Sequence, residues 1–307
     1  MTDTKKRSAS RMLWIAGLFL LLFCLFEQKA ILKGARKGIG LCLENVVPSL
    51  FPFMILSDLL ASNASESKGL YSFAFCKAFR TQPKGAHAFL MGALGGFPLG
   101  AKTVCLAYEN GELTKREAEH LLGFVNVTGP AFLVAGVGAA LRGNAAQGFV
   151  FYGIQILSAL LAGALTAPKK RRLEAHSLFE TEPFSIAASL ANNTAGMLSI
   201  CGTIVFFSAV ASLFCVVLPE NISVFLLAFL EITTGVDAIA GTLGTAGWLS
   251  FSLTCAAVCF GGVCVGVQSA VFAKKAKLSM KSYFKGKILC AVFGFLFGLL
   301  WCSLVRA

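Results

Sequence analysis

Charged residues are scarce in this sequence. Asp, Glu, Lys and Arg make up 14% of its 307 residues, against roughly 25% in ordinary soluble proteins. A soluble chain of this size still needs a charged surface around its core, and there is too little charge here to cover one. Because 56% of the residues are hydrophobic, lipid must replace water around much of the molecule. The sequence therefore predicts an all-α, polytopic membrane protein, not a soluble enzyme.

Patterns typical of metal or catalytic chemistry are also missing. The three His residues are scattered, and the 11 cysteines form no CxxC pair, so we expect no zinc site. We find no nucleophile–base arrangement, no motif of an intramembrane protease and no domain that could hydrolyse a nucleotide. We therefore expect no enzymatic activity, no cofactor and no bound metal.

Positive charge is present but confined to short blocks. The net charge of +12 gathers between the apolar runs, mainly at residues 5–11, 169–172 and 274–287, the last block ending at Lys287. Such blocks usually flank membrane spans on the cytoplasmic face. None lies in a soluble domain with interleaved aromatic residues, as nucleic-acid binding would require. We expect a lipid bilayer as a partner and no nucleic acid.

About seven to nine apolar stretches approach the roughly 20 residues that cross a bilayer. All are expected to be helices, because backbone groups in lipid must satisfy one another. The first is expected to be an uncleaved span that starts in the cytoplasm, since no small-x-small cleavage site follows it. The stretches lie at residues 12–28, 39–61, 86–107, 119–141, 147–167, 186–217, 222–242, 247–272 and 287–304.

The second half of the chain repeats the pattern of the first half. We expect an N-terminal span with an amphipathic interfacial helix over 28–38, two repeats and a basic cytoplasmic linker. Keeping the basic connections inside requires the stretches 86–107 and 222–242 to re-enter the membrane without crossing it. Each half then crosses three times, so the repeats are inverted, as in many transporters with broken helices. The expected boundaries are 1–38, 39–167, 168–185 and 186–307.

Glycine and proline interrupt the stretch 86–107 and create the first candidate site. Gly96, Pro98 and Gly100 should break the helix, and a new helix should begin near Gly100 with Lys102 in its first turns. Free N–H groups and the positive end of the helix dipole then favour an anion. The alternative is that Lys102 extends to the membrane interface. A nucleotide-binding P-loop is not expected, because no strand precedes the segment and the required Gly-Lys pair is absent.

The stretch 119–141 holds a second candidate site. Pro130 frees a backbone carbonyl, and Asn126 and Thr128 precede it. These side chains could bind a ligand, or they could form a polar clamp between helices. Just before them, the spacing of Thr114 and Glu117 predicts a helix that starts with a capping box.

The third candidate site lies in the stretch 222–242. Glu231, Thr234 and Asp237 place two acids in an apolar segment, where charge is costly. They could couple transport to an ion or a proton, or they could lie at the headgroups. Asn193, at the start of the second repeat, is expected to be the symmetric counterpart of Glu44 and Asn45 in the first repeat, unless both groups lie at span ends. Asp58, close to the end of its stretch, is expected to be solvated.

Three segments together resemble a known family. In this order, Asn45–Phe53, Gly95–Lys102 and Asn126–Pro130 resemble the YlbJ-type sporulation integral membrane proteins, of the nucleoside-recognition or Gate-domain family. The resemblance covers about residues 12–300. It implies a protein in the outer membrane around the forespore that passes dipicolinic acid towards the spore. From the apolar stretches and the basic blocks we expect this protein to be multi-pass with a cytoplasmic N-terminus. Dipicolinate is a small aromatic dianion, in agreement with an anion site at Lys102.

Three functions remain open at this point. The first is a transporter or facilitator of a small anionic metabolite, dipicolinate first among them. The second is a nucleoside-type carrier of the same fold, and the third is an assembly factor of the spore envelope that transports nothing. The sequence leaves open the coupling ion, the direction of transport and whether the chain forms a homo-oligomer.

Overall fold

The computed structural model describes residues 3–63, 70–168 and 185–306. These residues form fourteen α-helices and two π-helical segments, with no strand among them, which confirms the predicted all-α class. Within the described residues, four helical stretches are long and apolar enough to cross a membrane: Ala145–Thr166, Ile186–Val217, Trp248–Lys275 and Lys281–Val305.

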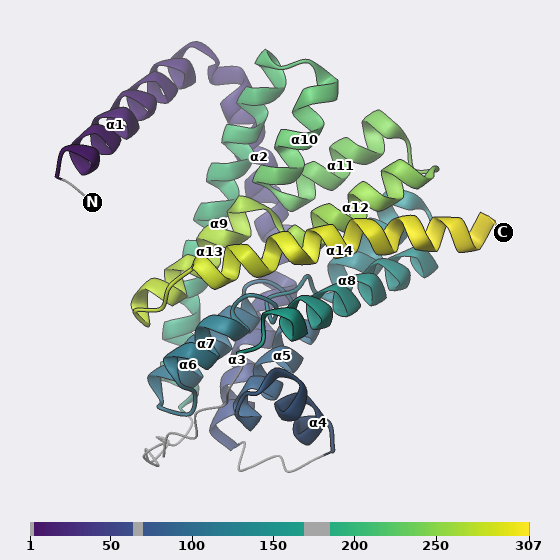
Figure 1. Cartoon of the computed structure of the whole chain (residues 1–307). Coiled ribbons are helices and arrows are strands. Elements are labelled where there is room, and N and C mark those ends of the chain that lie inside the picture. Colours follow the sequence, from purple (N-terminus) through teal and green to yellow (C-terminus); the bar gives the residue numbers. More distant parts are fainter. Residues whose placement is uncertain (1–2, 64–69, 169–184, 307) are drawn as a thin grey trace.

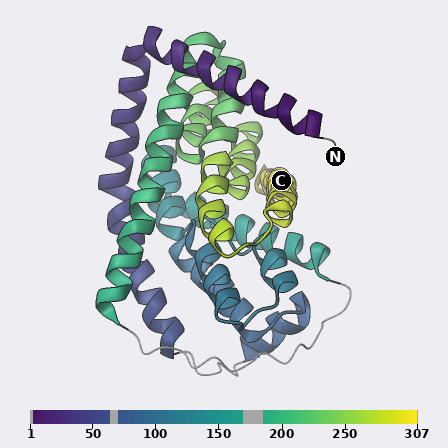
Figure 2. The ribbon, with the colours of Figure 1, turned by 90° about the vertical axis from the view of Figure 1, so that its left-hand side faces the viewer.

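Two long antiparallel helices form a scaffold along one side of the molecule (Figures 1 and 2). One is continuous through α2 (Gln28–Leu41), the π-helical η1 (Cys42–Val46) and α3 (Val47–Asn63); the other is α9 (Ile186–Val217). The two approach closely at glycine, since a Cβ on Gly38 would lie 2.8 Å from Val205 Cα. The π-helical turn ends just before Pro48, whose missing N–H cannot donate to the preceding turn.

The N-terminal segments differ in how they pack. Helix α1 (Asp3–Phe26) ends just before Glu27, the N-cap of α2, and extends away from the bundle (Figure 1). Residues 28–38, for which an interfacial helix was predicted, are helical and continue directly into the scaffold. Their Gly34 and Gly38 are buried, because this face packs along α9.

Both segments predicted to be interrupted are helical hairpins. Hairpin 1 consists of α5 (Pro83–Gly95) and α6 (Leu99–Glu109), and hairpin 2 of α10 (Glu220–Leu230) and α11 (Ile232–Leu243). The ends of each hairpin are tied together. Lys84 Nζ lies 2.8 Å from Glu112 Oε1, and the Thr242 hydroxyl donates to Glu220 Oε1 at 3.1 Å. Each hairpin therefore enters and leaves at the same end of the molecule.

Each half also contains one broken helix. In the first half, α7 (Lys115–Leu121) begins with the predicted capping box, and residues 122–129 are unwound before the π-helical η2 (Ala131–Leu141). In the second half, α12 (Trp248–Phe260) and α13 (Gly262–Lys275) are separated at Gly261, whose φ is 82°. We call residues 122–129 break 1 and Gly261 break 2.

The two broken helices run antiparallel to each other. Arg142, just after η2, donates to Ser250 and Thr254 at the start of α12. At the other end, Asn126 donates to Ser269 in α13 at 2.8 Å. Equivalent elements of the two halves thus point in opposite directions, as an inverted repeat requires.

One closing helix completes each half. In the first half this is α8 (Ala145–Thr166), and in the second half it is α14 (Lys281–Arg306). Each runs back along the broken helix of its own half. A ring nitrogen of His120 in α7 lies 2.9 Å from Gly163 O near the end of α8, and a Cβ on Gly298 would lie 2.8 Å from Ser252 Cα. The two closing helices also pack against each other in the middle of the molecule.

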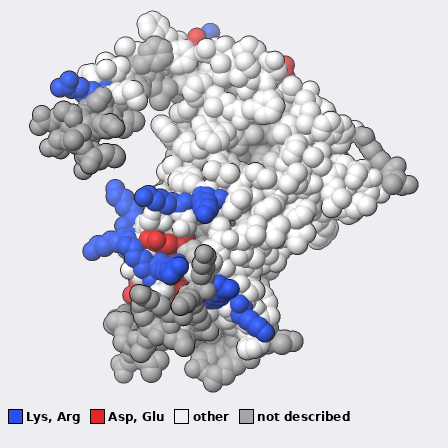
Figure 3. Space-filling model, in the orientation of Figure 1, with Lys and Arg blue, Asp and Glu red and all other residues white. Residues whose placement is uncertain are grey.

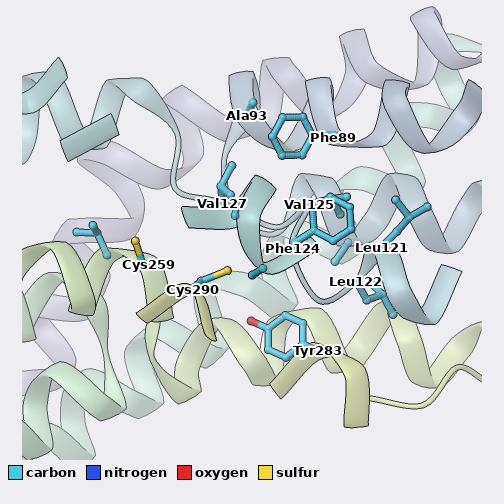
Figure 4. Close-up of a cluster of buried hydrophobic side chains, with 14 of the residues drawn as sticks. Phe89, Ala93, Leu121, Leu122, Phe124, Val125, Val127, Cys259, Tyr283 and Cys290 are labelled. Carbon is cyan, nitrogen blue, oxygen red and sulfur yellow. The ribbon is translucent and has the colours of Figure 1, made fainter. Parts of the chain in front are cut away.

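A buried aromatic cluster fixes α4 (Leu70–Phe79) against hairpin 1 and break 1. The rings of Phe79 and Phe124 are 4.9 Å apart, and those of Phe75 and Phe89 are 5.4 Å apart. Figure 4 shows Phe124 and Phe89 in this core, with Tyr283 of α14 on the opposite side. Break 1 is therefore held by packing on both sides, although it is not helical.

The connections predicted to be cytoplasmic gather at one end of the molecule. Arg80 donates to Pro168 O at 2.6 Å, and Ser279 N donates to Glu119 Oε1 at 3.0 Å. Lys and Arg side chains cluster over this end (Figure 3). Residues 169–184 of the linker lie outside the described residues.

The assignment of Lys287 to the basic cytoplasmic block was wrong. Lys281 and Lys285 are exposed, whereas Lys287 is only 1% exposed. The block continues into α14, and the turn of the helix directs Lys287 into the interior.

The glycine at the contact between the arms of hairpin 2 gives the first prediction. A Cβ at Gly235 would lie 2.2 Å from Ala228 Cα, whereas one at Gly241, on the same helix, would meet no atom within 4 Å. Where there is space for the Cβ, replacing Gly by Ala inside a helix stabilises the folded protein by about 1 kcal/mol. We expect Gly235→Ala to lower the unfolding temperature of the detergent-solubilised protein and Gly241→Ala to leave it unchanged or raise it. Equal effects of the two variants would contradict the hairpin packing.

Candidate functional site

The hairpin tips meet the breaks of the two broken helices. At the tip of hairpin 1, Gly96 has a φ of 80°, and a Cβ there would lie 2.7 Å from Gly129 N in break 1. The Phe97 ring lies against break 2, where a Cβ on Gly261 would be 2.8 Å from it. At the tip of hairpin 2, Leu230 O would be 3.0 Å from a Cβ on Gly262. Four interruptions of regular helix therefore converge in one central region, which we call the central layer.

Each half supplies the hydrogen bonds that the break of the other half needs. Lys287 Nζ, from α14, donates to Asn126 O in break 1 at 2.9 Å. Gln155 Nε2, from α8, donates at 3.2 Å to Val258 O, which precedes break 2. The same carbonyl accepts from the Thr128 hydroxyl at 3.2 Å. Unpaired backbone groups are costly inside an apolar bundle, and the two closing helices remove this cost reciprocally.

The predicted residues Asn126 and Thr128 do lie in the central layer. Their side chains act there as a polar clamp between the halves, one of the two predicted alternatives: Asn126 donates to Ser269 at 2.8 Å, and the Thr128 hydroxyl donates to Val258 O at 3.2 Å. Sequence reasoning missed Gln155, Ser269 and Lys287. Polar side chains within the apolar closing helices and α13 were the signal that could have revealed them.

Lys102 is buried in an ion pair. Helix α6 begins at Leu99, one residue before the predicted start, with Pro98 as its N-cap, so the predicted break is present. Lys102 Nζ lies 2.5 Å from Asp58 Oδ1 and 2.7 Å from Asn193 Oδ1. The side chain does not extend to the surface, and a carboxylate of the protein already neutralises it in this conformation.

Asp58, expected to be solvated, is solvated only in part, since 20% of its side chain is exposed. Its second oxygen, Oδ2, accepts from Ser189 Oγ at 2.8 Å and from Asn193 Nδ2 at 2.7 Å. Asp58, Lys102, Ser189 and Asn193 therefore form one polar cluster, which joins hairpin 1 to both scaffold helices. Asn193 is part of it and lies fully buried. A single acid within an apolar stretch was the signal that a buried partner existed.

The predicted residues of hairpin 2 do not form one site. Glu231 is 3% exposed, and its carboxylate caps α11 by accepting from Thr234 N at 2.8 Å and from the Thr234 hydroxyl at 2.9 Å. Asp237 points away from this cap and pairs with Lys37 of α2 at 3.0 Å, with about half of each side chain exposed, 46% and 47%. Glu231 thus shapes the tip, and Asp237 ties hairpin 2 to the scaffold.

The remaining predicted glycine, Gly100, makes a close contact. A Cβ there would lie 2.5 Å from Val125 O, so α6 can pack directly on the backbone of break 1. Among the described residues, no group of three or more His, Cys, Asp or Glu side chains is placed to hold a metal ion.

Comparison with known proteins supports the predicted resemblance. The chain is 26% identical to the sporulation integral membrane protein YlbJ of Bacillus subtilis (strain 168) over 347 aligned positions, which cover 96% of this chain and 84% of that protein. This match confirms the resemblance to YlbJ-type proteins, and together with the long apolar helices it places the chain in a membrane. No protein-family model matches the chain, and no solved structure matches it. The Gate-domain relationship stays a prediction.

The Asp58–Lys102 pair gives the second prediction. Removing one partner of a buried pair leaves an uncompensated charge and typically costs about 3–5 kcal/mol. Lys102→Met and Asp58→Asn should each lower the unfolding temperature strongly, and the double variant should lose less than the sum of the two. Lys37→Met provides the control, because exposed pairs contribute about 0–1 kcal/mol. Additive losses at Asp58 and Lys102 would show that the two charges do not interact.

Proposed function

We propose that this chain, a relative of the YlbJ-type sporulation integral membrane proteins, carries a small anionic metabolite across a membrane during endospore formation. The observation that carries the proposal is the central layer, where two hairpin tips meet the breaks of two antiparallel helices. In transporters built from inverted repeats, such interruptions near the middle of the membrane form the substrate site. Rocking of one part against the other then opens the site to alternate sides.

The attachment of the hairpins supports this function. In the described residues, hairpin 1 is joined to the scaffold by the buried Asp58–Lys102 cluster, and hairpin 2 by the half-exposed Lys37–Asp237 pair. For a hairpin to move as a unit, only a few polar contacts of this kind have to break and form again. Movements of rigid elements about short connections are a common basis of alternating access.

The charge of the molecule supports an anionic substrate. The end that gathers the predicted cytoplasmic connections is strongly basic (Figure 3). A positive surface raises the local concentration of anions. Dipicolinate, the substrate that the family resemblance implies, is a dianion. A nucleoside-type carrier and an assembly factor of the spore envelope are the alternatives, and the transport experiment separates them.

The third prediction concerns transport in proteoliposomes. Purified protein should accelerate the uptake of labelled dipicolinate and leave the uptake of uridine unchanged. Gly96→Ala should abolish this flux, because the added Cβ meets Gly129 of break 1. Gly244→Ala is the matched control: its φ of 73° gives similar backbone strain, but a Cβ there meets no atom within 4 Å.

Three results would count against the proposal. Uridine uptake in place of dipicolinate uptake would favour the nucleoside-type carrier. Absence of flux for both, with the protein folded and binding other sporulation membrane proteins, would favour the assembly factor. Equal flux in the Gly96→Ala and Gly244→Ala variants would be compatible with transport but would show that the tip of hairpin 1 takes no part in it.

The fourth prediction concerns sidedness. The experiment uses a variant that lacks its native cysteines, and the side that holds the N-terminus is taken as cytoplasmic. A single cysteine introduced at Glu109 should react with an impermeant reagent from the cytoplasmic side. One at Thr242 should react only from the opposite side, because the bases of the hairpins lie at opposite ends of the molecule (Figure 1). Labelling of both positions from one side would contradict the inverted arrangement in the membrane.

A further inference from the structure

Lys287 is a buried cation without a partner carboxylate in the described part of the chain. It is 1% exposed, and its Nζ donates to Asn126 O at 2.9 Å and lies 4.7 Å from the centroid of the Phe97 ring. An ammonium group has three N–H donors. Burying a charge is expensive unless it is paired and hydrogen-bonded, so this position calls for an anion.

The other half of the protein performs the same structural task without charge. Gln155 donates to the carbonyl of Val258 near break 2 as Lys287 donates to the carbonyl of Asn126 in break 1. Both residues come from the closing helix of one half and serve the break of the other. The neutral amide of Gln155 is sufficient near break 2. Pairing the backbone of break 1 therefore does not require the positive charge of Lys287.

Two buried polar groups lie near the backbone carbonyl that Lys287 binds. Asn126 Oδ1 and the Tyr283 hydroxyl are both buried and lie close to each other, although no hydrogen bond of good geometry joins them. The Tyr283 side chain, from the same helix as Lys287, is 1% exposed, and its hydroxyl lies near the side chains of Asn126 and Ser269 in the buried core. The acceptor belongs to Asn126, the residue whose carbonyl Lys287 binds, so polar groups with remaining capacity lie close to the charge.

We propose that Lys287 binds a carboxylate group of the transported anion. The carboxylate replaces the Phe97 ring as the partner of Lys287 when the tip of hairpin 1 moves away. This inference rests on the proposed function and names the group that recognises the substrate. A carboxylate forms charge-assisted hydrogen bonds with Lys, whereas the Phe97 ring offers only a cation–π contact. The anion therefore binds the state with a displaced tip better than the state described here, and binding shifts the population towards it.

Binding to the full-length protein in lipid nanodiscs tests this inference. The probes are dipicolinate and its neutral diamide, pyridine-2,6-dicarboxamide, and the readouts are calorimetric affinity and the shift in unfolding temperature. Lys287→Gln keeps a donor for Asn126 O, as Gln155 does for Val258 O, but removes the charge. We expect dipicolinate affinity to fall about tenfold or more, as the loss of a charge-assisted bond predicts. Lys287→Arg should retain most of the affinity.

Lys281→Gln is the matched control, because Lys281 lies on the same helix and is exposed. It should leave the affinity unchanged, and the diamide should bind no variant. Unchanged dipicolinate affinity in Lys287→Gln, or equal binding of the diamide and dipicolinate, would overturn the inference. If Lys287→Gln does not fold, Phe97→Ala decides: it removes the competing ring and should tighten dipicolinate binding, and unchanged or weaker binding would refute the proposal.

The outcomes separate this inference from the proposed function. Dipicolinate flux without Lys287-dependent binding overturns the role of Lys287 and leaves transport standing. Lys287-dependent binding without flux supports the anion site and overturns transport.

Discussion

Backbone groups that a broken helix leaves unpaired must find partners inside the protein, because lipid offers none. In this molecule each break is satisfied by a side chain of the opposite half: Lys287 serves Asn126 O, and Gln155 serves Val258 O. Neither half is therefore complete alone. The antiparallel arrangement of the broken helices and the position of the closing helices at the centre follow from this exchange, and the hairpin tips occupy the space that the breaks leave.

Much of this architecture could be predicted from the sequence. Gly96 and Pro98 lie at the tip of hairpin 1, and Glu231 lies at the tip of hairpin 2, because breaks within apolar stretches leave local signals. The distribution of basic residues predicted that both segments turn back. The contacts between segments could not be predicted in the same way: Asp58 and Lys102 are 44 positions apart, and their meeting depends on how hairpin 1 packs against the scaffold.

Lys287 shows a second limit of the sequence. It ends a basic block, and composition alone groups it with its exposed neighbours. Its burial is decided by the turn of α14 and by the approach of break 1, neither of which a one-dimensional pattern contains. The two halves have corresponding elements but differ in the charge of the side chain that each closing helix supplies. Two closing helices do the same structural work, one with a neutral amide and one with a charge, and the charge lies under the tip of a hairpin that is held to the scaffold by an ion pair. That combination is what supports the proposed anion carrier.

The central claim is that the two halves run antiparallel and meet at their breaks. It is tested most directly by pairing Asn126→Cys with Ser269→Cys in a protein that lacks its other cysteines and carries a protease site between the halves. Mild oxidation should join the two halves within one molecule, so that they stay together after cleavage and separate on reduction. Halves that separate without reduction, or cross-links that form only between molecules, would contradict the account.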